Sequence, residues 1–559
     1  MGRVDTAPLR AYRPLMSCRI VVCCALALVA CGDPEVVDAG PGDAGADAGL
    51  VDAAVALPDA GQLPDPSGEM ALDWSLVVTS AQRLGGVAES RLAPSPGGVV
   101  LSVSLGGASA TFADGTPEST TVGDDVDNSV TQALGWISDD GVLSAARAVA
   151  QADPVMDNYR GLGWDVETLP DGTAFVAGRF EGGARFGGAD PLAETFQTLR
   201  VIMDPDIPIT SGDAYLSRFD PSHAIEWTQR GQSESPVASL RFVDIEVLDD
   251  GGTIGIGIFD DPITLGTASS AERLALSAGA ERETFIARFD PTGALLWTRA
   301  LRGTSEPRRL AAYPDGSFIA LIRYADTLVL GAGEPAETTL TAPPDGTLFW
   351  DAVARFDAAG QLVWAVRFGS DATTYPGLES LRLDGDGVVL GGTFRGEIAW
   401  PEQPSVDPTV LYGAEALLTR LDAAGVVQWQ THVRPVRDIQ LQALAPAPDG
   451  GTWVLAGVSR DGATFGPAGA PPLELPGDAT LDSRLVLLRF DDAGEMAAAQ
   501  LLGEVEIDAD DLLVTAAGEL IMAGRFGEGT VLEPGTSAAR ALPSAASFRN
   551  VFVARYRPR

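Results

Sequence analysis

Apolar and polar residues alternate with a period of two along most of the chain, and short turn sequences interrupt the alternation. In FIARFDPTGALLW (285–297), Phe285, Ala287 and Phe289 fall on one face of an extended segment. This alternation is typical of a half-buried β-strand. Asp-x-x-Gly is typical of a hairpin turn, because the Asp side chain accepts hydrogen bonds from backbone donors and Gly adopts positive φ. The stretch therefore predicts a β-hairpin.

The same hairpin recurs along the chain. Further copies are YLSRFDPSHAIEW (215–227), AVARFDAAGQLVW (352–364), LLTRLDAAGVVQW (417–429) and the weaker VLLRFDDAGEMAA (486–498). The Asp position and its degenerate equivalents fall at 65, 138, 220, 290, 357, 422, 491 and 557, which defines seven intervals. A nearly fixed period of this kind indicates a repeat architecture.

Each interval contains a second hairpin, such as LPDGTAFVAGRF (169–180) or APDGGTWVLAGV (447–458). Two hairpins supply four strands, and a ring of four-stranded sheets is a β-propeller. The chain begins just after a hairpin turn and ends just before one, so a strand at about 68–78 is expected to pair with one at 550–556. The sequence predicts an all-β, seven-bladed β-propeller of four-stranded antiparallel blades, closed by pairing of the N- and C-terminal strands.

The repeat resembles that of the seven-bladed β-propeller repeat proteins of bacterial envelopes. The shared features are the ARFDxxGxxxW hairpin, the PDGxxxxxG hairpin and a short tail seen here as ARFG (184–187), ITLG (263–266), LVLG (328–331) and ATFG (463–466). The resemblance covers residues 65–559 and is weakest in the first two blades. It implies an architecture, and no catalytic motif comes with it.

The N-terminal sequence resembles a targeting signal. Arginines precede the apolar run IVVCCALALVA (20–30), which is too short to span a bilayer and fits a secretory signal. LVAC (28–31) resembles the bacterial lipobox, so residues 1–30 are expected to be a lipoprotein-type signal, starting at Met1 or Met16, with lipid such as palmitate attached to Cys31. An ordinary signal peptide with a chance cysteine is the alternative. The Asp/Ala/Gly/Pro-rich segment 31–64 is expected to be a disordered tether, and residues 65–559 the propeller.

The net charge and the cysteine positions bear on which classes of partner and site we expect. The formal net charge is −39, which disfavours nucleic acid as a partner. All four cysteines lie within the first 31 residues, so no disulfide framework or thiol nucleophile is expected in the propeller. The expected partners are a membrane, through the lipid anchor, and an unidentified envelope protein or polysaccharide. The expected location is the bacterial cell envelope, as an outer-membrane lipoprotein facing the periplasm or the cell surface.

Three positions of the hairpin repeat have two interpretations each. The tryptophans are a stacking platform for sugars or, as we favour, packing between neighbouring blades. The arginines are an anion-binding ring or, as we favour, one half of a ladder of Arg–carboxylate bridges with the recurrent Asp. The positions are Arg218, Asp220, Trp227, Arg288, Asp290, Trp297, Arg355, Asp357, Trp364, Arg420, Asp422 and Trp429.

Catalytic and metal motifs are sparse. His223 and His432 have no companion at metal-ligand or triad spacing, and G-x-S-x-G is absent. The acidic stretches 123–129, 383–387 and 506–511 could bind calcium but do not match the EF-hand loop. We therefore expect no catalytic residue and no cofactor, with calcium as the alternative.

Long connections precede each FxARFD strand, for example 188–214 and 331–352. Because function on such scaffolds resides on loops, the face from which these connections emerge is the expected interaction surface. The sequence thus predicts a lipid-anchored binding or scaffold module. Two alternatives remain open, namely a carboxylate-based polysaccharide-acting enzyme at the propeller channel and a calcium-stabilised structural repeat protein.

Overall fold

The computed structural model describes residues 70–558, apart from the segments 81–88, 107–108, 114–115, 118, 124–129, 153–159, 188–189, 205–206, 267–270, 278–279, 343–348, 371–376, 404–408, 434–438, 449, 467–470, 479–480, 482, 516 and 544–549. The expected signal and tether (1–64), including Cys31, lie outside the described residues. Residues 60–559 form one structural unit, and the fold below is that of this unit.

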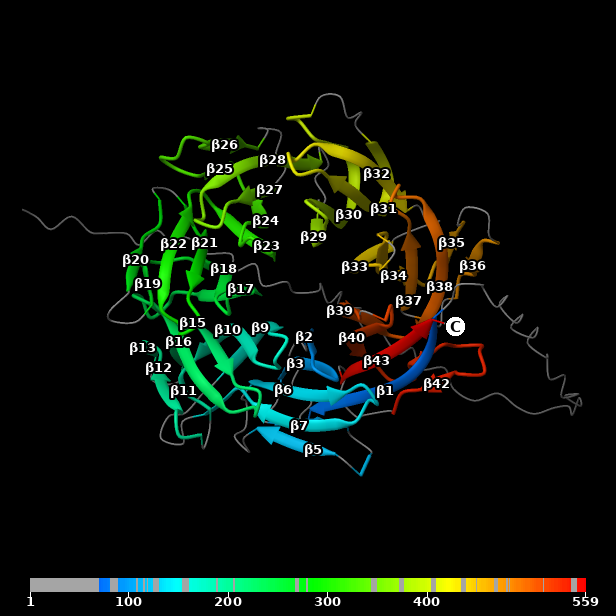
Figure 1. Cartoon of the computed structure of the whole chain (residues 1–559), viewed down its shortest axis with the longest axis horizontal. Coiled ribbons are helices and arrows are strands. Elements are labelled where there is room, and N and C mark those ends of the chain that lie inside the picture. Colours follow the sequence, from blue (N-terminus) through cyan, green and yellow to red (C-terminus); the bar gives the residue numbers. More distant parts are fainter. Residues whose placement is uncertain are drawn as a thin grey trace, which may run out of the picture. The chain divides into compact units, whose positions relative to one another are not determined.

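Seven antiparallel sheets surround a common centre, as Figure 1 shows, and each follows the strand order predicted from the two hairpins. Blades 1 to 4 consist, from the centre outward, of β2 (Glu89–Ser95), β3 (Gly98–Gly106), β6 (Val130–Ser138) and β7 (Leu143–Ala148); β9 (Arg160–Thr168), β10 (Ala174–Glu181), β15 (Gly212–Phe219) and β16 (Ile225–Ser233); β17 (Leu240–Val247), β18 (Thr253–Phe259), β21 (Glu283–Phe289) and β22 (Leu295–Leu301); and β23 (Ser305–Ala312), β24 (Phe318–Tyr324), β27 (Trp350–Phe356) and β28 (Leu362–Ser370).

Blades 5 to 7 consist of β29 (Gly377–Asp384), β30 (Gly387–Ala399), β31 (Thr409–Leu421) and β32 (Val427–Val433); β33 (Ile439–Pro446), β34 (Thr452–Ser459), β37 (Ser483–Phe490) and β38 (Met496–Glu504); and β39 (Ile507–Val514), β40 (Leu520–Phe526), β43 (Asn550–Pro558) and β1 (Met70–Ser80). The first strand of the described chain is therefore the outer strand of the last blade. Its partners run from Met70↔Pro558 to Val78↔Val551, which confirms the predicted closure and the all-β, seven-bladed fold.

The hydrophobic core is divided among the interfaces between blades. One cluster, for example, joins Ile254 and Ile286 of blade 3 to Phe318, Ile322 and Tyr324 of blade 4. Seven such clusters occur, one for each pair of neighbouring blades around the ring. Because each sheet presents both faces to neighbours, the strands are apolar on both sides near the middle, and the ring is held by contacts that neighbouring blades share.

The long connections fold into further strands. These are β4 (Ser109–Phe112), β5 (Thr120–Gly123), β11 (Gly183–Phe186), β12 (Glu194–Gln197), β13 (Arg200–Asp204), β14 (Ile207–Thr210), β19 (Ile263–Leu265), β20 (Glu272–Leu274), β25 (Thr327–Leu330), β26 (Thr338–Thr341), β35 (Ala463–Phe465), β36 (Leu473–Leu475), β41 (Val531–Leu532) and β42 (Arg540–Ala541). A further strand, β8 (Ala150–Ala152), lies between β7 and β9 and pairs with β11. The described residues include no helix that is long and apolar enough to cross a bilayer.

These connection hairpins bind the neighbouring blade. β4 pairs with β1 of blade 7, β19 with β16 of blade 2, and β41 with β38 of blade 6. In each case the connection inside one blade pairs with the outer strand of the blade before it. The predicted long loops are therefore largely ordered hairpins that lie on the outer rim and cross-link the ring.

Candidate functional site

The recurrent Asp caps the turn in which it stands. Asp290 Oδ1 accepts hydrogen bonds from the backbone N–H groups of Thr292 and Ala294, at 2.8 and 2.9 Å. Asp220, Asp357, Asp422 and Asp491 hold their own turns in the same way. The hydroxyl and backbone donors of Thr292 lower the pKa of Asp290, outweighing partial burial. Each of these carboxylates therefore stabilises the turn in which it stands.

Arg and Trp of one blade dock on the turn of the next. Arg355 and Trp364 are cross-strand neighbours, and both donate to the carbonyl oxygen of Ala423 in blade 5, at 3.2 and 2.8 Å. Each indole also lies against a turn glycine: a Cβ on Gly425 would stand 2.9 Å from the Trp364 ring. Two donors thus meet one carbonyl across a blade interface.

Other interfaces repeat this arrangement. Arg218 and Trp227 both donate to the Pro291 oxygen, and Trp429 donates to the Asp492 oxygen at 2.9 Å. The Trp297 ring packs against Gly360. At the closing interface, Trp74 and Arg555 take the same roles toward the Asp139 oxygen. The recurrent tryptophans, and the arginines named here, therefore make contacts between blades.

The predicted ladder between these arginines and the recurrent Asp is wrong. Arg288 pairs with Asp250 at 2.7 Å and Arg420 with Asp384 at 2.5 Å, both within their own blade, while Arg218 pairs with Glu226 at 2.8 Å. Oδ1 of the recurrent Asp accepts the backbone donors of its own tight turn. The guanidinium groups reach instead for carbonyl oxygens and other carboxylates.

His223 stands in its hairpin turn where the other copies of the hairpin have glycine. It is half-buried, adopts φ of +69°, and stacks on Trp136 of blade 1 with ring centroids 4.1 Å apart. Blade 1 has Ala145 at the position of the docking Trp, as blade 6 has Ala498, and Trp136 is the cross-strand neighbour of Ala145. The indole thus comes from the adjacent strand, and an imidazole replaces the turn glycine that would otherwise meet it.

The inner strands are joined by side chains that bond to the neighbouring backbone. Asp165 of β9 accepts from Ile245 N–H at 2.8 Å, and Asp244 of β17 accepts from Leu310 N–H at 2.6 Å. Asp511 of β39 accepts from Leu92 N–H at 2.8 Å. Irregular pairing interrupts β17 beside Asp244 and β39 beside Asp511, and bulges of this kind re-aim side chains.

Four carboxylates gather at the centre of the ring from blades 2 and 3. Burial, followed by the charges of Asp244 and Glu167, raises the pKa of Asp165 well above 3.8, and a hydrogen bond with Asp244 adds to this. Burial, then the charges of Glu246, Asp244 and Asp511, likewise raises the pKa of Glu167. The pKa values of Asp244 and Glu246 are also raised, chiefly by burial. Sequence reasoning did not single these residues out, although acidic residues at alternate positions of an inner strand were a visible signal.

Three acidic segments were considered as calcium sites. Where the structure describes them, their carboxylates bind other side chains. Asp384 pairs with Arg382 and Arg420, and Asp508 accepts from Gln442 at 3.1 Å. Residues 124–129 lie outside the described residues. No group of three or more His, Cys, Asp or Glu side chains in the described part of the chain is arranged to hold a metal ion.

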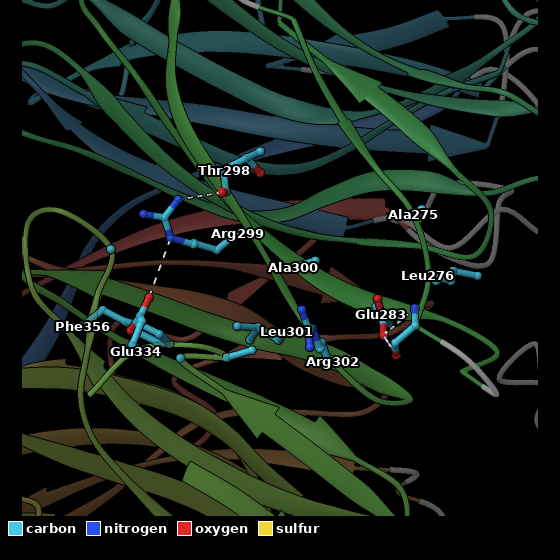
Figure 2. A pocket seen from close by; sticks show the side chains of 14 residues that line it. Ala275, Leu276, Glu283, Thr298, Arg299, Ala300, Leu301, Arg302, Glu334 and Phe356 are labelled. Atoms are coloured by element: carbon cyan, nitrogen blue, oxygen red, sulfur yellow. Dashed lines mark hydrogen bonds and ion pairs between the residues drawn. The ribbon is translucent and has the colours of Figure 1, made fainter. Parts of the chain in front are cut away.

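A pocket of about 540 Å³ lies on the outer rim between blades 3 and 4 (Figure 2). Its walls are the outer strand β22, the returning connection of blade 3 and the connection tip of blade 4, and its floor includes Phe356. Two acids and two bases line it, namely Glu283, Arg299, Arg302 and Glu334. Arg299 faces Glu334 across 3.9 Å. The long connections thus form a polar groove of ligand size.

Comparisons with known proteins assign no function to the chain. No protein-family model and no curated protein matches the chain. Among solved structures, it is similar to a protein of unknown function from Bacteroides caccae, at 14% identity over 64% of this chain and 93% of that one, with a TM-score of 0.27.

A member of the duf4221 family from Bacteroides vulgatus is 6% identical over 71% of this chain and 92% of its own, with a TM-score of 0.26. Sqt1 from Chaetomium thermophilum is 12% identical over 87% and 99%, with a TM-score of 0.33. Because these TM-scores are low, the assignment as a seven-bladed β-propeller rests on the strand pairing described above.

Proposed function

We propose that this protein is a binding or scaffold module of a bacterial envelope, anchored by lipid on Cys31 and binding its partner on the rim formed by the connection hairpins. The observation that carries the proposal is the pocket between blades 3 and 4, whose walls are the connections of two successive blades. The recurrent Arg and Trp residues make contacts within the ring. The side chains of the variable connections are therefore the ones we expect to bind a partner.

Capture from envelope extract with the full-length protein tests the binding surface. Substituting Arg302→Ala and Glu334→Ala together alters the rim pocket, whereas Asp165→Asn with Asp244→Asn alters the centre of the ring. The proposal expects the rim variant to lose retained material and the central variant to keep it. Loss with the central variant alone would move the binding surface to the ring centre.

The anchor is tested separately by labelling cells with a radioactive fatty acid. Label should enter the wild-type protein and be absent from Cys31→Ala, which should also leave the membrane fraction. Labelling that persists in the variant would refute lipid attachment at Cys31.

An enzyme that cleaves polysaccharide with carboxylates is the second candidate. It is favoured by the gathering of Asp165, Glu167, Asp244 and Glu246, since raised carboxyl pKa values suit general acids. Release of reducing ends from envelope polysaccharides by the wild type, but not by Asp165→Asn, would favour this candidate over the binding module.

A further inference from the structure

The rim pocket contains a buried carboxylate oxygen that accepts no hydrogen bond from the part of the chain that the structure describes. Glu283, at the start of β21, is 0% exposed. Its Oε1 accepts from Gly303 N–H at 3.0 Å and Ser277 N–H at 3.1 Å. Its Oε2 has no hydrogen-bond partner among the described residues. A buried carboxylate oxygen without a donor is costly and calls for an explanation.

The neighbouring blade contains the same site with its cation in place. Asp213 is the counterpart of Glu283, six residues before the last Phe of its strand. One Asp213 oxygen accepts from Ser233 N–H at 3.0 Å, as Glu283 accepts from Gly303. The other oxygen binds the guanidinium of Arg230, whose Nε donates at 2.8 Å.

Blade 3 lacks this arginine. Arg230 lies opposite Tyr215 in the β15–β16 pair, and the equivalent position opposite Phe285 is Ala300. Ala300 and Glu283 both line the rim pocket. In blade 4 the equivalent position is again arginine, Arg367, which lies over the Trp350 ring at 5.2 Å. Blade 3 therefore has the acceptor and the space of a guanidinium site but not the guanidinium.

We propose that the rim pocket binds the guanidinium group of an arginine side chain presented by a partner polypeptide, with Glu283 Oε2 as its acceptor. This inference rests on the proposed binding function and names its ligand chemistry. A guanidinium satisfies a buried carboxylate with paired donors, which an ammonium group does less well. The exposed Arg302 lines the same pocket and opposes a second cation, so the incoming arginine has to displace it from the entrance.

Calorimetric titration of the full-length protein tests the site. The probe is N-acetyl-arginine amide, and the matched control is the neutral N-acetyl-citrulline amide. We expect weak, saturable binding of the arginine compound only. Glu283→Gln should weaken it by about tenfold or more, since the bond is charge-assisted. Equal binding of the two compounds, or unchanged binding by Glu283→Gln, would overturn the assignment.

Two variants use the internal repeat as a control. Ala300→Arg should place an arginine where blade 2 has Arg230, abolish probe binding and raise the melting temperature. Arg230→Ala should lower the melting temperature and create a second site beside Asp213. If Ala300→Arg binds the probe as the wild type does, the pocket is not a guanidinium site.

The same experiment separates this inference from the proposed function. Probe binding that Ala300→Arg abolishes, together with unchanged capture from envelope extract, supports the guanidinium site and contradicts the rim as the main partner surface. Capture lost in the rim variant without probe binding contradicts the guanidinium site alone. A high-resolution structure with Arg302 bound to Glu283 Oε2 would also overturn the inference.

Discussion

Asp165 and Asp244 illustrate how single residues in this ring serve two purposes. Each carboxylate accepts a backbone N–H from the next inner strand, and the two are hydrogen-bonded to each other. A hydrogen bond between carboxyl groups needs a proton on one of them. Burial raises both pKa values, and the charge of Asp244 raises that of Asp165 further, whereas the hydrogen bond with Asp165 lowers the pKa of Asp244. The inner strands are therefore joined most strongly when this cluster is partly protonated.

Stability should decrease as the pH rises through the raised pKa values of the central carboxylates. A raised carboxyl pKa means that the folded state holds its proton more tightly than the unfolded state. Its contribution is complete below the ordinary carboxyl range and is lost on alkalinisation. Asp165→Asn supplies a donor without titration, so its melting temperature should exceed that of the wild type at about pH 8 and match it more closely at about pH 5.

Asp290→Asn is the control for this pH experiment, because hydrogen bonds lower the pKa of Asp290. Its contribution is present above the unfolded pKa and is lost as the pH falls. This variant should lower the stability by a constant amount at neutral and alkaline pH and leave the alkaline decrease itself unchanged. A wild-type profile without an alkaline decrease would contradict the interpretation of the central cluster.

Gly425 should tolerate no side chain, for two reasons that a control can separate. Its φ is +78°, and a Cβ would approach the Trp364 ring to 2.9 Å. Gly333 has a similar φ of +84° with nothing within 4 Å of a Cβ. Gly333→Ala should cost about 1 kcal/mol of unfolding free energy from the backbone alone, and Gly425→Ala distinctly more. Equal losses of unfolding free energy in chemical denaturation would show that the Trp364 indole moves aside at little cost.

At the scale of strands and hairpins, the docking pair unites neighbouring blades through a single acceptor. The guanidinium of Arg355 and the indole of Trp364 share the Ala423 oxygen, and Arg355 also lies over the Tyr313 ring at 4.6 Å. Loss of either hydrogen bond is therefore expected to weaken the other.

A double-mutant cycle on Arg355→Gln and Trp364→Phe should therefore give a coupling free energy. We expect each single substitution to cost about 1–2 kcal/mol and the two together to depart from additivity by about 0.5 kcal/mol or more. Urea unfolding of the four proteins provides the measurement. Strict additivity would indicate that the two donors act independently.

The sequence predicts the hairpins well because their turns are chemically explicit. Asp at the start and Gly at the positive-φ position specify the turn wherever they recur, so blade number and order follow from counting. Partners that depend on distance in space are not encoded in this way. The predicted Arg–Asp ladder is wrong, since Oδ1 of Asp290 and of its equivalents accepts hydrogen bonds from the backbone of its own turn. The pairing of connection hairpins with the preceding blade has no local sequence signature.

The rim pocket could have been found from the sequence by comparing blades column by column. Asp213 and Glu283 occupy one column, and Arg230, Ala300 and Arg367 another. A small residue facing an acid in one blade only is a visible exception. The central carboxylates are harder to find, because their proximity depends on inner strands from different blades meeting at the centre of the ring.

At the scale of the whole molecule, the propeller depends on closure of the ring by its first and last strands. The outer strand of blade 7 comes from the N-terminal end of the described chain and its other three strands from the C-terminal end. The closing interface uses the same docking contacts as the others, with Trp74 and Arg555 donating to Asp139. In the closed ring each blade has a neighbour on both sides (Figure 1), so only short, protected sheet edges remain.

A cross-strand disulfide is the most direct measurement of this closure. Ser75 and Ala554 are opposite each other in the β1–β43 pair, and the native cysteines, all within the first 31 residues, can be replaced by serine. The account predicts that Ser75→Cys with Ala554→Cys oxidises to an intramolecular disulfide, seen as faster migration without reductant and as a linked peptide by mass spectrometry. Ser75→Cys with Val553→Cys, one residue out of register and on the opposite face, should not. No disulfide in the first protein, or equal linkage in both, would contradict a ring closed by its first and last strands.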